Sequence, residues 1–128
     1  MTTSDPQPTH KGHYLGTEID ETWWKRFTKD KLFARGNGVY WFDPTNFCFR
    51  RYLTKQPIQI PYQAITGLKI GKSHAGRWFA GGPILKIVWK KNGATLSSGF
   101  IVAKDLARTE SVKLTLENKI GQQEKTSS

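Results

Sequence analysis

The dipeptide Asn92-Gly93 constrains the fold of this chain more than any other feature of its sequence. A two-residue type I′ turn needs positive φ at both central positions, and Asn followed by Gly tolerates this conformation. Apolar residues alternate on both sides of the dipeptide, in residues 84–91 and 94–102. The sequence therefore predicts an antiparallel hairpin with one apolar face. The residues predicted to lie on that face are Leu85, Ile87, Trp89, Leu96, Phe100 and Val102.

Turn signals recur about every ten residues through the body of the chain, and the apolar pattern between them is mostly of period two. Residues 24–33 are predicted as a first strand and Gly36-Asn37-Gly38 as a turn, because glycine adopts positive φ. Asp43-Pro44-Thr45-Asn46 fits a type I turn between strands 39–42 and 47–53. We expect Phe47, Phe49 and Leu53 to share the buried face of the second of these strands.

The next part of the chain is punctuated by proline and glycine. Residues 57–60 are predicted as a short strand that Pro61 ends, and a turn then leads to an extended segment, 66–73. Residues 74–83 contain three glycines and a proline, which predicts a loop.

Residues 104–120 fit two patterns. Val112, Leu116 and Ile120 recur at the four-residue spacing of a helix, whereas Val112, Leu114 and Leu116 alternate as in a strand. The absence of Gly and Pro and the many good helix formers favour the helix. Asp105 is then expected at or next to the N-cap.

The length of 128 residues fits one domain. Residues 1–20 are polar and aperiodic, with one basic and three acidic residues, and are predicted to be a flexible or partly docked acidic N-terminal extension. The domain is placed at 21–120 and a disordered tail at 121–128. Neither a membrane-spanning run nor the apolar core of a secretory signal is recognised, and the single cysteine, Cys48, forms no internal disulfide. These features favour the cytoplasm, including the inner face of the membrane.

The positive charge is concentrated in the body of the chain. The net charge is +10, and residues 22–91 carry 14 basic residues against two acidic ones. Such a surplus attracts polyanions, which include phospholipid headgroups, nucleic acids and acidic protein surfaces. A solubilising surface without a specific partner is the alternative reading of the same charge.

Three short segments together resemble a known family. They are Gly38-Val39-Tyr40, Phe47-Cys48-Phe49 and the run from Ile58 to Leu68, which contains Ile58-Gln59-Ile60-Pro61 and then Ile65. They are similar to the pattern of GRAM and bacterial PH-like domains. The resemblance implies a mainly β fold with one C-terminal helix: a PH-like barrel of two roughly orthogonal antiparallel sheets, with six or seven strands, capped by the helix. An unrelated small β-barrel or sandwich is the alternative.

The same resemblance implies a non-catalytic binding or scaffold module. Eukaryotic lipid-binding PH domains carry a basic cluster across their first hairpin, and the corresponding stretch here lacks the Lys-x-Arg or Arg-x-Arg triplet that ends it. The resemblance therefore implies a preference for anions rather than phosphoinositide specificity. The basic residues in that stretch are Lys25, Arg26, Lys29, Lys31 and Arg35.

No motif for catalysis or for a cofactor is recognised. The run from Gly67 to Ser73 has three residues where a P-loop needs four before its Gly-Lys-Ser. His10 and His13 have no third metal ligand nearby in the sequence, and Cys48 is expected to be a buried, unreactive thiol. We therefore expect no catalytic residues, no metal and no cofactor.

The loop over residues 72–79 is the second candidate site. It places cationic side chains beside an aromatic one, which suits a ligand with a negative charge and an apolar or planar part. Its candidate residues are Lys72, His74, Arg77 and Trp78. Trp78 folded back over the barrel is the structural alternative.

Two functions remain from the sequence. The first is a PH-like module that recognises a protein partner or an anionic membrane surface through its basic face. The second is a nucleic-acid-binding small β-barrel, suggested by tryptophans among the basic residues. The position of the only predicted helix at the end of the chain argues against an OB-type barrel.

Overall fold

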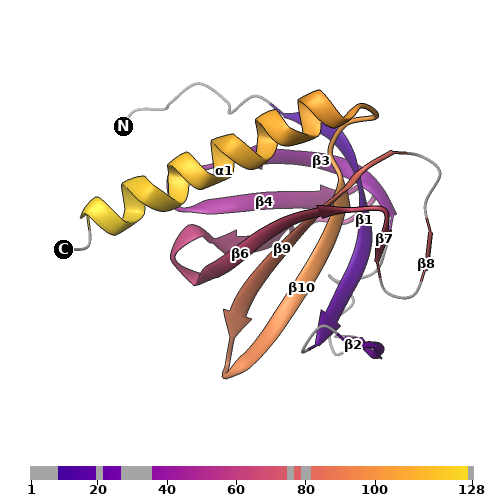
Figure 1. Cartoon of the computed structure of the whole chain (residues 1–128), viewed down its shortest axis with the longest axis horizontal. Coiled ribbons are helices and arrows are strands. Elements are labelled where there is room, and N and C mark those ends of the chain that lie inside the picture. The colour runs from indigo at the N-terminus through magenta and orange to yellow at the C-terminus, as the bar shows by residue number, and fades with distance from the viewer. Residues whose placement is uncertain (1–8, 20–21, 27–35, 75–76, 79–81, 127–128) are drawn as a thin grey trace.

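The computed structural model describes residues 9–19, 22–26, 36–74, 77–78 and 82–126 (Figure 1). Within these residues, ten strands and a short 3-10 helix precede one long helix. In chain order they are β1 (His10–Ile19), β2 (Thr22–Arg26), β3 (Gly36–Phe42), β4 (Asn46–Arg51), β5 (Ile58–Pro61), η2 (Tyr62–Ala64), β6 (Ile65–Gly71), β7 (Ser73–His74), β8 (Arg77–Trp78), β9 (Ile84–Lys91), β10 (Ala94–Ile101) and α1 (Leu106–Thr126).

Seven strands form an antiparallel sheet in the order β5-β4-β3-β1-β10-β9-β6, and β2 pairs with β1 beside this path. β1 pairs with β3 on one side and with β10 on the other, and so it joins the two halves of the sheet. The strands curve around a common interior, and α1 lies across one end of it (Figure 1). The mainly β fold with one C-terminal helix is confirmed.

The β9–β10 hairpin has the predicted turn. Asn92 and Gly93 have φ angles of 51° and 83°, which is the left-handed conformation that a type I′ turn requires. The predicted face is also confirmed, because all six apolar residues assigned to it are buried in the core cluster.

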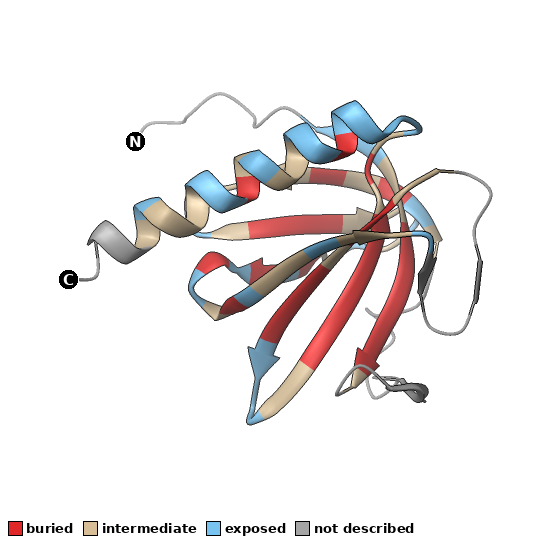
Figure 2. Cartoon of the chain, viewed as in Figure 1, coloured by how far each residue is buried: buried red, intermediate tan, exposed pale blue. Residues whose placement is uncertain are grey.

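Aromatic side chains make up much of the buried core cluster. Figure 2 shows buried residues along β1, β4, β9 and β10. The ring of Phe100 lies 5.2 Å from that of Phe47 and 5.5 Å from that of Phe49, measured between centroids. One polar network is buried among them. The Tyr14 hydroxyl is hydrogen-bonded to Thr17 Oγ1, which lies 2.7 Å from Ser98 Oγ, and Trp89 Nε1 donates to the same Ser98 oxygen over 3.0 Å. Each of these polar groups therefore has a partner, as burial requires.

Helix α1 packs one stripe against the barrel. Leu116 is fully buried and Val112 and Ile120 pack against the core, whereas Leu114 is exposed. This is the four-residue stripe that favoured the helix. The helix continues to Thr126, so the prediction of a disordered tail is wrong for residues 121–126.

The prediction of a flexible extension over residues 1–20 is wrong for residues 10–19. These form β1, in which Tyr14, Leu15, Thr17 and Glu18 are buried. The register shifts between Tyr14 and Gly16, and this bulge breaks the alternation that identifies a strand in a sequence. Thr17 is buried because Ser98 and Tyr14 satisfy its hydroxyl. Residues 1–8 and 20 lie outside the described residues.

Two further local predictions are wrong. Gly36-Asn37-Gly38 is part of β3 rather than a turn, and Gly38 is required there because an added Cβ would lie 2.1 Å from the Arg50 carbonyl oxygen. Leu53 is fully exposed, with a φ of 69°, in the turn that follows β4. Of the predicted first strand, only residues up to Arg26 are described, in β2.

The corner from Asp43 to Asn46 joins β3 to β4 at the predicted place. Asp43 Oδ1 accepts hydrogen bonds from the backbone nitrogens of Thr45 (2.9 Å) and Asn46 (2.6 Å). The predicted break at Pro61 is also found, because β5 ends there and η2 follows. The predicted loop at 74–83 holds a short ladder, in which Ser73 pairs with Trp78 and His74 with Arg77.

Candidate functional site

The predicted site residues fall into three groups in the structure. Lys29, Lys31 and Arg35 lie outside the described residues. Lys25 and Arg26 lie on β2, and His74, Arg77 and Trp78 lie on the β7–β8 ladder, with only their backbone described. Lys72 is exposed between β6 and β7. The two predicted clusters thus remain predictions, and Lys72 is the member whose exposure is described.

A group of lysines lies on the outer face of β6 and β9. Leu85, Ile87 and Trp89 point into the core, so Lys86 and Lys90 point to the opposite face of β9. Lys69 lies directly opposite Lys86 in the β6–β9 register. We call Lys69, Lys86 and Lys90 the lysine face.

The lysine face has no carboxylate on its own strands. β6, β9 and β10 contain no Asp or Glu, and Lys91 adds a further exposed charge beside the hairpin turn. Like charges directly opposite each other on adjacent strands destabilise a sheet. The placement of Lys69 opposite Lys86 brings two positive charges together on this face.

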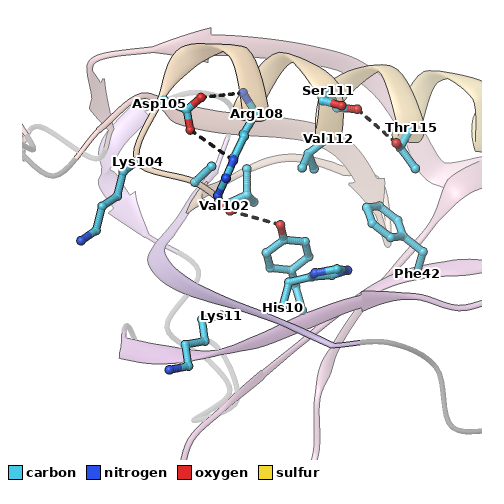
Figure 3. A pocket seen from close by; sticks show the side chains of 12 residues that line it. His10, Lys11, Phe42, Val102, Lys104, Asp105, Arg108, Ser111, Val112 and Thr115 are labelled. Carbon is cyan, nitrogen blue, oxygen red and sulfur yellow. Dashed lines mark hydrogen bonds and ion pairs between the residues drawn. The ribbon is translucent and has the colours of Figure 1, made fainter.

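The second cationic region is a pocket of about 630 Å³ beneath the first turns of α1 (Figure 3). The start of β1, the end of β3 and the segment from β10 into α1 bring its walls together. Three cationic side chains line it: Lys11 from β1, Lys104 from the connecting segment and Arg108 from α1.

The carboxylate of Asp105 also lines the pocket, where it caps α1. Its Oδ2 accepts a hydrogen bond from the Arg108 backbone nitrogen (3.2 Å), and its Oδ1 lies 3.8 Å from Arg108 Nε. This confirms Asp105 as the N-cap. Asp105 thus satisfies the Arg108 backbone N–H in the first turn of the helix, and three side chains bring positive charge to the pocket.

Aromatic rings form the floor of the pocket. The ring of His10 lies 5.1 Å from that of Tyr40, and Phe42 meets Tyr40 edge to face at 6.1 Å. The Tyr40 hydroxyl donates to the Val102 carbonyl oxygen over 3.1 Å, and burial raises the pKa of this phenol above its ordinary value of 10.0. Tyr40 therefore stays neutral at physiological pH and offers its ring, rather than its hydroxyl, to the pocket.

The buried titratable groups of the corner are held in their neutral forms. Burial, with the nearby Asp43 carboxylate, raises the pKa of Cys48 from 9.0 to about 12. The same two causes, in the same order, raise the pKa of Tyr62, whose hydroxyl donates to the Asp43 carbonyl oxygen over 2.8 Å. Cys48 is therefore a weak nucleophile, as its place in the strand predicted.

Within the described ranges, no three side chains of His, Cys, Asp or Glu are placed to hold a metal ion. His13 contacts Asn37 instead, with Nδ1 and Oδ1 2.6 Å apart. Neither described helix, η2 or α1, has the length and apolarity that crossing a bilayer requires.

Sequence reasoning missed the pocket. The sequence places Lys11 and His10 in a predicted N-terminal extension, and Lys104 and Arg108 in the predicted helical segment 104–120. The available signal was that Lys104 and Arg108 lie on either side of Asp105, the N-cap. A helix that begins at Leu106 brings both to one end of the barrel.

The antiparallel sheet and the single C-terminal helix across one end of the barrel are consistent with the class of PH-like domains, which as a rule are non-catalytic binding modules. The chain belongs to the bacterial PH domain-like family, because the model of that family matches residues 2–116. No curated protein matches the chain. The PH-like part of the predicted resemblance is confirmed, and its GRAM part stays a prediction.

Proposed function

We propose that this protein is a binding module that recognises an anionic membrane surface through the lysine face. The observation that carries the proposal is the row of Lys69, Lys86 and Lys90 on strands without a carboxylate, with Lys69 and Lys86 directly opposite each other. Lysines near an anionic leaflet each contribute about 1 kcal/mol of attraction. A row of them on a sheet surface suits a target that is itself extended.

The residue type favours a membrane over a protein partner. The centres of protein interfaces are depleted in lysine and enriched in aromatic residues, methionine and arginine. The exposed large apolar side chains of the described residues lie elsewhere: Tyr52, Leu53, Leu106 and Leu114. The lysine face therefore offers charge without the apolar anchors of a protein interface.

The test is co-sedimentation with vesicles of phosphatidylcholine alone and of phosphatidylcholine with added phosphatidylserine. We expect binding only to the anionic vesicles. The double variant Lys69→Ala with Lys86→Ala should lower the affinity by about tenfold or more, from the attraction lost with two lysines. Its matched control is Lys55→Ala with Lys119→Ala, which removes the same charge from other elements and should retain most of the binding.

A parallel titration with a fluorescent single-stranded oligonucleotide separates the alternative. Binding of the oligonucleotide at physiological salt, without vesicle binding, would overturn the membrane proposal in favour of nucleic acid. Binding to neither would overturn it in favour of a protein scaffold. Equal losses in the two double variants would show that net charge, rather than the lysine face, governs association.

A further inference from the structure

The pocket beneath α1 differs in chemistry from one side to the other. In Figure 3 the side chains of Lys11 and Lys104 lie on the left, that of Arg108 lies nearer the centre, and Phe42 lies on the right. Its volume of about 630 Å³ falls within the range of small-ligand sites, which is roughly 300 to 1,000 Å³.

The cationic side has charge available for a ligand. Lys11 and Lys104 are both exposed, and neither has an ion-pair partner among the described residues. Arg108 is in contact with Asp105, whose carboxylate is the one negative group that lines the pocket. Three cations against one carboxylate leave a net positive end, which attracts an anion.

The opposite side has few unsatisfied polar groups. The hydroxyl of Tyr40 donates to Val102, and that of Thr115 donates to the Ser111 carbonyl oxygen over 3.1 Å. Between them lie the Phe42 ring and the Val112 side chain, both only partly buried against the core. At this end of the pocket, an apolar group of a ligand therefore binds more favourably than a polar group.

We propose that this pocket binds a small amphiphilic anion. Its carboxylate or phosphate group lies against Lys11, Lys104 and Arg108, and its apolar body lies against Phe42 and Val112. The proposal does not rest on the lysine face, because the pocket is built by other residues. With this pocket the domain binds a small soluble ligand as well as a membrane surface.

The test is a calorimetric titration of the whole chain with decyl phosphate and with decanoate, each as a monomer below its micelle concentration. We expect saturable binding of one ligand per chain. The stronger of the two probes identifies the preferred anionic group. Decanol has only the apolar chain and inorganic phosphate has only the anionic group. Each should bind at least about tenfold more weakly than decyl phosphate, because both parts of the ligand contribute to the affinity.

Three variants locate the site. Lys11→Ala with Lys104→Ala removes charge, and Ser111→Trp fills the space from an exposed position on α1; each should weaken binding at least about tenfold. Lys69→Ala with Lys86→Ala should bind as the parent protein does, which keeps this test separate from the vesicle test. Thermal melting of each variant establishes that it is folded.

Tight binding of decanol equal to that of decyl phosphate would overturn the proposal, because the cations would then contribute nothing. Unchanged binding in both pocket variants would overturn it as well, since the ligand would occupy another place. Absence of saturable binding by either anionic probe would have the same consequence.

Discussion

The lysine face and the pocket beneath α1 both gather positive charge, but the surroundings of that charge differ. On the lysine face the cations stand on the outer side of β6 and β9, beside other residues of an open sheet. In the pocket they stand at one end of a hollow whose other end is aromatic and aliphatic. The first arrangement attracts through charge alone, whereas the second couples charge to apolar contact.

This difference predicts how each region responds to solution conditions. Attraction between exposed charges weakens as salt shortens the Debye length, whereas apolar contact is maintained. Association at the lysine face depends on charge alone and is therefore reversed by salt. Association in the pocket also depends on apolar contact and therefore on the shape of the ligand.

The largest expected effect is that of salt. Raising the ionic strength from about 0.1 to about 1 M shortens the Debye length from about 10 to about 3 Å. Affinity for anionic vesicles should then fall more than about tenfold, whereas affinity for decyl phosphate should fall only about two- to threefold. Sedimentation and calorimetry at the two salt concentrations measure this. Equal losses of affinity for vesicles and for decyl phosphate would show that charge alone governs binding at both regions.

The next effect concerns the carboxylate of the pocket. Asp105→Ala removes the N-cap of α1, which should lower the free energy of unfolding by about 1 kcal/mol. It also removes the one acid that lines the pocket, and so affinity for decyl phosphate should rise a few-fold, with vesicle binding unchanged. Denaturant titration and calorimetry test the two parts. Weaker binding of decyl phosphate would mean that Asp105 positions Arg108 for the ligand.

The smallest effect is on the stability of the lysine face. Lys86→Glu replaces a like-charge pair opposite Lys69 with an opposite-charge pair, which should raise the free energy of unfolding by about 0.2 to 1 kcal/mol. The control is Lys90→Glu, which lies opposite Thr95 and should give no such gain. Urea denaturation compares them. A loss of stability in Lys86→Glu would show that the two lysines do not repel each other.

The parts of the fold that the sequence predicted are those where local chemistry decides the structure. Asn92-Gly93 requires left-handed φ, Asp43 caps its own turn, and the stripe of Val112, Leu116 and Ile120 needs only one apolar neighbour to pack against. Each of these signals lies within a few residues of the structure that it predicts.

β1 and the pocket were not predicted, because both depend on residues far apart in the chain. Thr17 is buried only because Ser98 lies beside it, and Gly38 is needed only because Arg50 approaches it across β3 and β4. The pocket likewise combines β1, β3 and α1. A polar segment with two glycines resembles a loop until its partners are known, and no local pattern names those partners.

The position of β1 between β3 and β10 has a consequence for how the protein is made. Its partners in β10 lie about eighty residues later in the chain, as the Thr17 to Ser98 contact shows. During synthesis on the ribosome, β1 therefore leaves the exit tunnel long before β10 exists. Half of its backbone pairing waits until the last strand emerges, so the sheet closes late and as one cooperative event.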